Sequence, residues 1–129
     1  MQVRSSGSVR IFSLDRAKLL DRLRVAAEQL AAAHPEVEEV WLFGSLARGD
    51  ARPGSDADVL VILTESALPF HERSPRYRLA SCGIGVDLLL YTRAEFDNLP
   101  TSAPRFAAAV AADRLLLYGP SPAEVGEAG

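Results

Sequence analysis

Residues 37–63 read VEEVWLFGSLARGDARPGSDADVLVIL, and this stretch decides the fold. A strand is expected from about Glu38 to Phe43, in which Val40 and Leu42 alternate against the other face before Gly44 ends the run. The next part, Gly44 to Gly54, is rich in Gly, Pro, Asp and Ser, which predicts a loop with one short helical turn. Val59 to Leu63 is a continuous apolar run, typical of a central strand covered on both faces.

A second apolar run, from Val86 to Tyr91, is interrupted only by Asp87. Roughly twenty residues separate the two apolar runs, which suits a crossover between parallel neighbours and is far too long for a tight hairpin. We expect a short helix in this crossover, around Arg76 to Ala80. The two runs therefore predict a parallel pair of strands.

The remaining segments supply further elements around these strands. Their limits follow from the helical spacing of apolar residues, from capping residues and from the helix stop at Pro35. They are a helix that begins at Ser13, a helix from Arg93 to about Asn98 after the capping box of Thr92 and Glu95, a helix from Phe106 to Asp113, and Leu115 to Tyr118 as a short edge strand or packed tail. The expected fold class is α/β, a small mixed β-sheet with flanking helices.

Bulk properties fit one small globular domain. The 129 residues are 48% hydrophobic and 24% charged, and we expect a domain over residues 13–118 between flexible segments at 1–12 and 119–129. The formal net charge of -3 argues against a nucleic-acid partner. The single cysteine, Cys82, cannot form an internal disulfide, so a cytoplasmic location is expected. No apolar run has the ~20 residues of a membrane span, so no membrane association is expected.

Three aspartates occupy positions that a structural core would give to apolar residues. Asp56 and Asp58 stand at the mouth of an apolar strand, where alternate residues share a face and their Cα atoms are ~6.5 Å apart. Asp87 enters the next strand, at the same end if the two strands are parallel neighbours. Neither strand contains Lys or Arg to balance these charges. Oxygen ligands suit Mg²⁺ or Mn²⁺ bridged to substrate phosphates, so a divalent cation site is predicted.

Gly44 and Ser45 follow the first expected strand and precede the expected helical turn. This arrangement directs backbone N–H groups and a hydroxyl toward an anion, and Gly44 permits close approach of the backbone. Phosphates on one side and three carboxylates on the other describe a site for phosphoryl or nucleotidyl transfer.

The order of these residues is similar to that of a known superfamily. Gly-Ser, ten residues, Asp-x-Asp and a third Asp on a later strand resemble the DNA polymerase beta-like nucleotidyltransferases. The form GSLARGDARPGSDADVLV looks like the minimal nucleotidyltransferase branch, which is often paired with a helical HEPN partner protein. The resemblance covers about Val37 to Tyr118 and implies the polymerase beta-like nucleotidyltransferase fold.

The resemblance also implies a role for each residue of the motif. Asp56 and Asp58 would bind two Mg²⁺ ions, and Asp87 would bind the catalytic ion and help to deprotonate the acceptor hydroxyl. The residues implied in nucleotide binding are Gly44, Ser45, Arg48 and Ser55.

The implied reaction is the transfer of a nucleoside monophosphate, AMP from ATP, to a hydroxyl of an acceptor. The leading hypothesis takes a HEPN-type toxin as that acceptor, which would make this chain an antitoxin that acts by modification. Two alternatives stay open: transfer to a small molecule such as an aminoglycoside-type antibiotic, and a non-catalytic module that binds nucleotide and silences a partner by contact. A homo-oligomer also stays open.

Other candidate residues are interpreted as structural. Arg73, Arg76 and Arg78 are expected to form a solvated face, because a cluster of this kind is usually exposed. Trp41 and Phe43 are expected to pack the core, and base stacking by one of them is the alternative.

Overall fold

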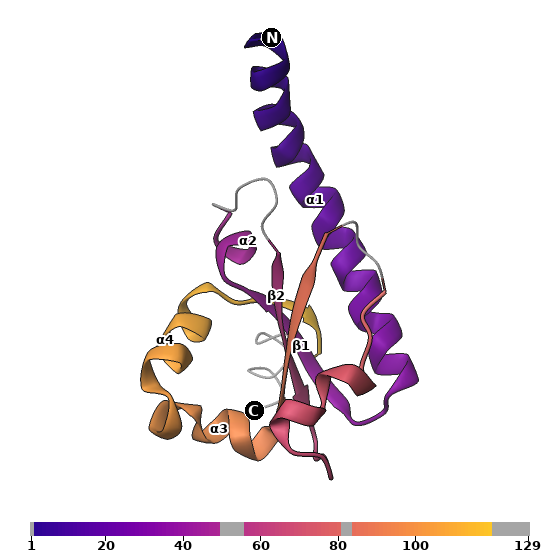
Figure 1. The fold of residues 1–129 in the computed structure, drawn as a ribbon, viewed down its shortest axis with the longest axis vertical. Helices are drawn as coiled ribbons and strands as arrows, with labels where there is room; N and C mark the ends of the chain where they lie inside the picture. Colours follow the sequence, from indigo (N-terminus) through magenta and orange to yellow (C-terminus); the bar gives the residue numbers. More distant parts are fainter. Residues whose placement is uncertain (1, 50–55, 81–83, 120–129) are drawn as a thin grey trace, which may run out of the picture.

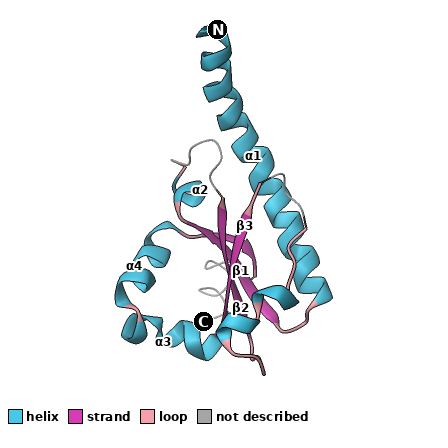
Figure 2. Cartoon of the chain, viewed as in Figure 1, coloured by secondary structure: helices cyan, strands magenta, loops and turns pink. Residues whose placement is uncertain are grey.

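A mixed sheet lies at the centre of the chain, with helices on both sides (Figures 1 and 2). Its strands are β1 Val37–Phe43, β2 Ala57–Leu63, β3 Val86–Thr92 and β4 Leu115–Tyr118. The helices are α1 Gln2–Ala33, α2 Ser45–Arg48, α3 Arg93–Ser102 and α4 Pro104–Asp113, with short 3₁₀ turns η1 Phe70–Glu72 and η2 Ser74–Arg76. This computed structural model describes residues 2–49, 56–80 and 84–119, with side chains from Arg16 onward.

The strand order is β3-β2-β1-β4. Strand β1 is antiparallel to β2 and to β4, while β2 and β3 are parallel neighbours. The predicted α/β class, the mixed sheet and the parallel pair are therefore confirmed. Of the two readings of residues 115–118, the edge strand is confirmed.

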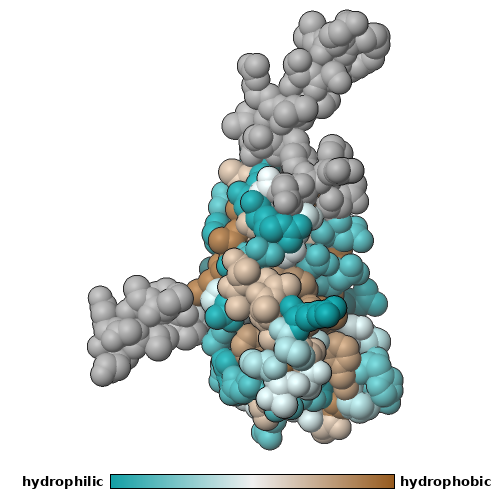
Figure 3. Space-filling model, turned by 90° about the vertical axis from the view of Figure 1, so that its left-hand side faces the viewer, coloured by the Kyte–Doolittle hydropathy of each residue, from teal (hydrophilic) through white to brown (hydrophobic). Residues whose placement is uncertain are grey.

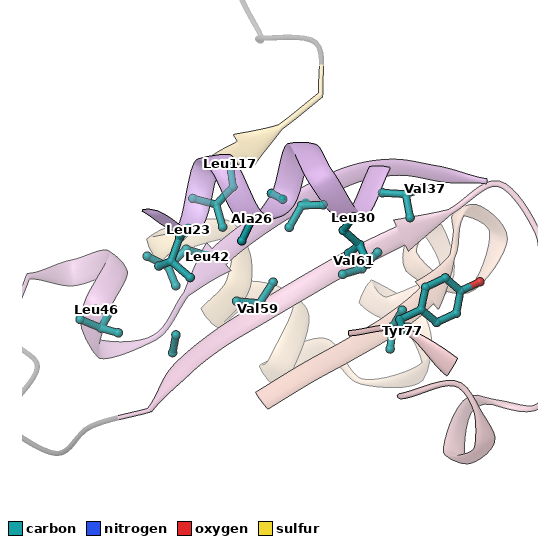
Figure 4. Close-up of a cluster of buried hydrophobic side chains, with 14 of the residues drawn as sticks. Leu23, Ala26, Leu30, Val37, Leu42, Leu46, Val59, Val61, Tyr77 and Leu117 are labelled. Carbon is teal, nitrogen blue, oxygen red and sulfur yellow. The ribbon is translucent and has the colours of Figure 1, made fainter. Parts of the chain in front are cut away.

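The sheet separates two apolar clusters, because successive side chains of a strand point to opposite faces. Val59, Val61 and Leu63 of β2 join the cluster that contains the apolar residues of α1 (Figure 4). Leu60 and Ile62 join the cluster on the opposite face. All five side chains are fully buried, which confirms that this strand is covered on both faces. Burial of each contributes roughly 1.5–3 kcal/mol relative to exposure.

Helices α3 and α4 cover the second face, on the side of the sheet opposite α1 (Figure 1). Their contribution is aromatic: Phe96 of α3 and Phe106 of α4 pack against a cluster that includes Trp41. Helix α3 begins with the predicted capping box, in which the Glu95 backbone N–H donates to Thr92 Oγ1 at 3.2 Å and the Thr92 N–H donates to Glu95 Oε1 at 2.9 Å. Viewed from this side, the surface mixes hydrophilic and hydrophobic residues (Figure 3).

The predicted start of the first helix is wrong. Helix α1 begins at Gln2, so Ser13 lies inside it and does not cap it. The segment before Ser13 contains no proline, and extending a formed helix costs far less than starting one. Whether residues 1–12 and 119–129 are flexible stays a prediction, and residues 120–129 lie outside the described part of the chain. No helix in the described ranges is long and apolar enough to cross a membrane.

The helix predicted around Arg76 to Ala80 is also wrong. Turn η2 ends at Arg76, and Tyr77 is extended, with φ -123° and ψ 128°. The Tyr77 ring is buried in the larger cluster, and its hydroxyl donates to Glu36 Oε2 at 2.6 Å. This tertiary contact outweighs the weak local preference for a helix.

The expected solvated arginine face is wrong for Arg73. Its side chain is only 3% exposed, and its guanidinium pairs with both carboxylate oxygens of Glu95, at 2.6 and 3.0 Å. It also donates to the backbone oxygens of Leu68, at 2.8 Å, and Leu90, at 3.0 Å. Arg76 and Arg78 are exposed, as expected.

Candidate active site

The three predicted aspartates meet at one end of the sheet. Asp58 of β2 and Asp87 of β3 are direct neighbours in the parallel register, and Asp56 comes just before β2. Side chains at Asp56 and Asp58 share a face by the alternation of the strand. Asp58 is half-buried, whereas Asp56 and Asp87 are exposed. The parallel pairing therefore brings together carboxylates that are about thirty residues apart in sequence, as the length of the crossover between the two apolar runs predicted.

The electrostatics of Asp58 show that its charge is unfavourable in the absence of a ligand. Burial raises the pKa of its carboxyl above the ordinary value, and the neighbouring charges of Asp87 and Asp56 raise it further. The positive charge of Arg48 acts in the opposite direction. A cation bound among these carboxylates would relieve the repulsion.

Two glycines let the carboxylates lie close against the backbone. A Cβ on Gly44 would lie 2.5 Å from Asp58 Oδ2, and a Cβ on Gly85 would come closer still to Asp56 Oδ1. Gly85 also accepts a hydrogen bond from the Ala57 backbone N–H, at 2.9 Å, which ties the start of β2 to the residue before β3. Sequence reasoning missed Gly85, although its place directly before the strand with the third aspartate was a signal.

The donor set fits Mg²⁺, which prefers carboxylate oxygens and usually keeps several ligands from water or substrate phosphates. Within the described ranges, no three His, Cys, Asp or Glu side chains converge closely enough to hold a metal ion by themselves. Because Gly44 and Gly85 carry no side chain, the carboxylates of Asp58 and Asp56, which the motif would assign to both ions, lie close against the backbone at the start of β2. The residues present therefore fit a cation whose remaining ligands come from a phosphate.

Gly44 makes the turn from β1 into α2, with φ 79° and ψ -157°. Only glycine adopts this region readily, because a Cβ would clash with the adjacent backbone. Helix α2 confirms the predicted helical turn, and its buried Leu46 anchors it in the larger cluster. Ser45 is half-buried at the start of this helix.

Arg48, a further predicted nucleotide-binding residue, is the last residue of α2. The guanidinium of Arg48 lies 3.1 Å from Asp113 Oδ2, so it joins α2 to the end of α4. Its charge also acts on Asp58, which is consistent with a place beside the carboxylates. Ser55 lies outside the described residues.

A cleft of about 830 Å³ opens beside Asp58 and Asp87. Its walls come from β1, β2, β3, α4 and residues 74–79. The lining residues are Phe43, Asp58, Ser74, Pro75, Tyr77, Arg78, Leu79, Val86, Asp87, Leu88, Leu89 and Phe106. The ring of Phe43 meets that of Phe106 edge to face, with centroids 5.7 Å apart. Phe43 is thus part of the cleft wall, whereas Trp41 is buried as predicted.

Replacing Gly44 by Ala is expected to destabilise the protein by about 1–2 kcal/mol, because of backbone strain, and to displace the Asp58 carboxylate. Gly119→Ala is the matched control. Gly119, directly after β4, also has a positive φ, of 127°, but a Cβ there would meet Glu39 and not Asp58. Denaturant unfolding should show a lower free energy of unfolding in both variants, and nucleotide binding should be lost only in Gly44→Ala. Equal nucleotide binding by the two variants would contradict the close fit of Gly44 against Asp58.

Comparisons with known proteins give one family and solved structures of similar fold. Residues 23–108 match the family described as "Nucleotidyltransferase domain". A protein from Sulfolobus solfataricus, provisionally assigned as a nucleotidyltransferase, superposes with a TM-score of 0.58 at 25% identity, over 84% of this chain and 86% of that one. A toxin-antitoxin structure with AMP-PNP shares the fold, with a TM-score of 0.52 and 22% identity over 79% of this chain and 77% of that one. Comparison with curated proteins gives no match.

The family match spans both strands that hold the aspartates, the glycine turn and α2, so it includes every described residue of the candidate site. Fold, order of motifs and sequence family point the same way. The chain belongs to the nucleotidyltransferase domain family, and its class is that of a nucleotidyltransferase.

Proposed function

We propose that this chain transfers AMP from ATP to a hydroxyl group of a helical, HEPN-type partner protein and so acts as the antitoxin of a toxin–antitoxin pair. The observation that carries the proposal is the register of Asp58 against Asp87 in adjacent parallel strands, beside the glycine turn at Gly44. The fold shared with a toxin-antitoxin structure that contains AMP-PNP supports the choice of nucleotide and partner class.

Each residue of the site has a role in this proposal. Gly44 and Ser45 hold the triphosphate, and Arg48 neutralises part of its charge. The carboxylates of Asp56 and Asp58 would hold two Mg²⁺ ions, and Asp87 would hold one of them. When bound, these ions would neutralise the phosphates and make the acceptor hydroxyl more acidic. A contribution of Ser55 to nucleotide binding stays a prediction.

The chemical step is an in-line displacement. The acceptor oxygen forms a bond to the α-phosphorus, the bond from that phosphorus to the bridging oxygen breaks, and pyrophosphate leaves. Asp87 accepts the hydroxyl proton. The protein contributes mainly position and charge neutralisation, because phosphoryl transfer requires little covalent chemistry from side chains.

An acceptor carried by another protein suits the position of Asp87. Strand β3 is at the end of the strand order, so this carboxylate lies beside an edge of the sheet and not in its middle. Its side chain is exposed, and the cleft of about 830 Å³ opens next to it. A large acceptor can therefore approach the third carboxylate from outside.

Calorimetric titration of ATP with Mg²⁺ tests the nucleotide site. We expect the wild-type protein to bind ATP, and the double variant Asp56→Ala, Asp58→Ala to bind at least about 30-fold more weakly, because both shared ligands are lost. Asp87→Asn should bind ATP with a Kd within about threefold of wild type, because only one ion loses a ligand. It should lose transfer of labelled AMP, because the acceptor of the hydroxyl proton is gone.

Asp21→Asn serves as the control, since the Asp21 side chain is 80% exposed on α1. A folded wild-type protein that binds no triphosphate would count against the proposed enzyme and favour a module that acts by contact. Transfer to an aminoglycoside-type antibiotic but not to a helical protein would favour the small-molecule alternative.

A further inference from the structure

We propose that Arg16, on α1, is a positioning residue of the nucleotide site, which it serves by holding α2 in place. The inference rests on the proposed function, because α2 begins directly after Gly44, and Gly44 and Ser45 are the residues assigned there to the triphosphate. Arg16 itself is not expected to touch the nucleotide.

The contacts of Arg16 are directed at the far end of α2. Its Nε donates to the Leu46 backbone oxygen at 3.1 Å, and its Nη2 donates to the same oxygen at 2.9 Å. Nη2 also donates to the backbone oxygen of Ala47, at 3.1 Å. The Arg16 side chain is half-buried, so it is partly shielded from competing water. One guanidinium thus joins the first helix of the chain to two successive carbonyls of the glycine-turn helix.

Helix α2 needs such support because it is a single turn of four residues. Its own closing bonds run from the Arg48 N–H to Gly44 O, at 3.0 Å, and from the Gly49 N–H to Ser45 O, at 2.9 Å. A helix this short is not stable alone, and its last carbonyls have no partner within the helix. Arg16 supplies donors to two of these carbonyls, and a cation at the C-terminal end also interacts favourably with the helix dipole.

The position of α2 matters because Gly44 fits tightly beside Asp58. A Cβ on Gly44 would already lie 2.5 Å from Asp58 Oδ2, so the turn and the carboxylate approach as closely as glycine allows. A shift of about 1 Å in such an arrangement can reduce the rate of a reaction about a hundredfold. Loss of Arg16 would leave the far end of α2 held only by the Arg48–Asp113 pair and the buried Leu46 among the contacts described here, and would loosen the fit of Gly44 against Asp58.

The test compares Arg16→Met and Arg16→Lys with Arg24→Met. Arg24 is on the same helix, and its exposed side chain lies 3.8 Å from Asp21. Two quantities are measured: the hydrogen exchange of the Arg48 and Gly49 amides without nucleotide, and the calorimetric Kd of ATP with Mg²⁺. Thermal unfolding confirms that each variant is folded.

In Arg16→Met we expect both amides to exchange about tenfold faster and the Kd to rise about tenfold, because several charge-assisted hydrogen bonds are lost. Arg16→Lys should recover only part of each effect, since an ammonium group cannot reproduce the planar fork of donors. Arg24→Met should behave as wild type.

Two results would overturn the inference. One is an Arg16→Met variant whose α2 amides and Kd are unchanged. The other is an Arg16→Lys variant equal to wild type in both measurements, which would mean that Arg16 acts as a charge alone. If the wild-type protein binds no triphosphate, the proposed function fails, and the hydrogen exchange of α2 still decides whether Arg16 holds it.

Discussion

Asp58→Asn is expected to lower the rate of nucleotidyl transfer by about 10³-fold or more. It should also raise the thermal stability of the ligand-free protein at pH 7. Activity is lost because the amide cannot supply a negatively charged ligand to the ions in the proposed site. Stability rises because the carboxylate is half-buried beside Asp87 and Asp56, where its negative charge is unfavourable. Asn keeps the shape of the side chain next to Gly44, so no cavity or clash is introduced.

The gain in stability depends on pH in a defined direction. Burial raises the pKa of the Asp58 carboxyl in the folded state above its ordinary value of 3.8, so the folded protein binds the proton more tightly than the unfolded chain. The destabilisation is therefore absent below the unfolded pKa, and it develops as the pH rises through the folded pKa. The difference in Tm between Asp58→Asn and wild type should be positive at pH 7 and should shrink toward zero below about pH 4.

Thermal unfolding at several pH values, together with a transfer assay, measures both effects. Asp21→Asn, at an 80% exposed side chain, should change neither. A lower Tm for Asp58→Asn at pH 7 would mean that the carboxylate stabilises the fold, and the electrostatic account of this site would then be wrong.

The strands could be predicted from sequence because apolar runs bounded by Gly and Asp have few alternative structures. The run at residues 59–63 and the run interrupted by Asp87 led directly to β2 and β3 and to their parallel pairing. The same pattern placed Asp87 at the same end of the sheet as Asp56 and Asp58, because parallel neighbours begin at the same end, whereas the register of Asp58 with Asp87 comes from the structure. The part of the candidate site that lies on strands was therefore accessible from spacing alone.

Features that depend on tertiary contacts could not be predicted in the same way. The extended backbone at Tyr77 follows from its bond to Glu36, which is about forty residues away in sequence. Arg16 bonds to carbonyls of α2, thirty residues away, and no local pattern marks such a donor. Gly85 differs, since its place before the strand was visible but its closeness to Asp56 required the assembled sheet.

Sequence reasoning was most misleading at Arg73, where it predicted an exposed side chain and the structure has a buried one that contributes to stability. A cluster with Arg76 and Arg78 suggested a solvated face, yet Arg73 is 3% exposed and the other two are exposed. The difference arises because Arg73 faces Glu95, the capping-box residue of α3, across the edge strand β3. A long charged side chain is buried only when its donors are satisfied, and these contacts satisfy them.

Arg73→Met is expected to destabilise the protein by about 2–3 kcal/mol at pH 7, because the Leu68 and Leu90 carbonyls lose their donor and Glu95 loses its partner. The Arg73 hydrogen bond is the main cause of a lowered pKa at Glu95. Stability from this pair is therefore present above the unfolded pKa of 4.5 and is lost as the pH falls through the lower folded value. The difference in unfolding free energy between wild type and Arg73→Met should therefore decrease in acid.

Denaturant unfolding at pH 7 and near pH 3 checks this prediction, with Arg76→Met as the matched control at an exposed neighbour. Glu95→Gln separates the ion pair from the cap, because Gln also serves in a capping box while it removes the charge. We expect Glu95→Gln to lower the free energy of unfolding by about 1 kcal/mol at pH 7, and this variant's stability should change little in acid. An equal loss of unfolding free energy in Arg73→Met and Arg76→Met would mean that the buried guanidinium contributes nothing beyond its apolar stem. If the difference in unfolding free energy between wild type and Arg73→Met were the same at pH 7 and near pH 3, Glu95 would be excluded as the partner that matters.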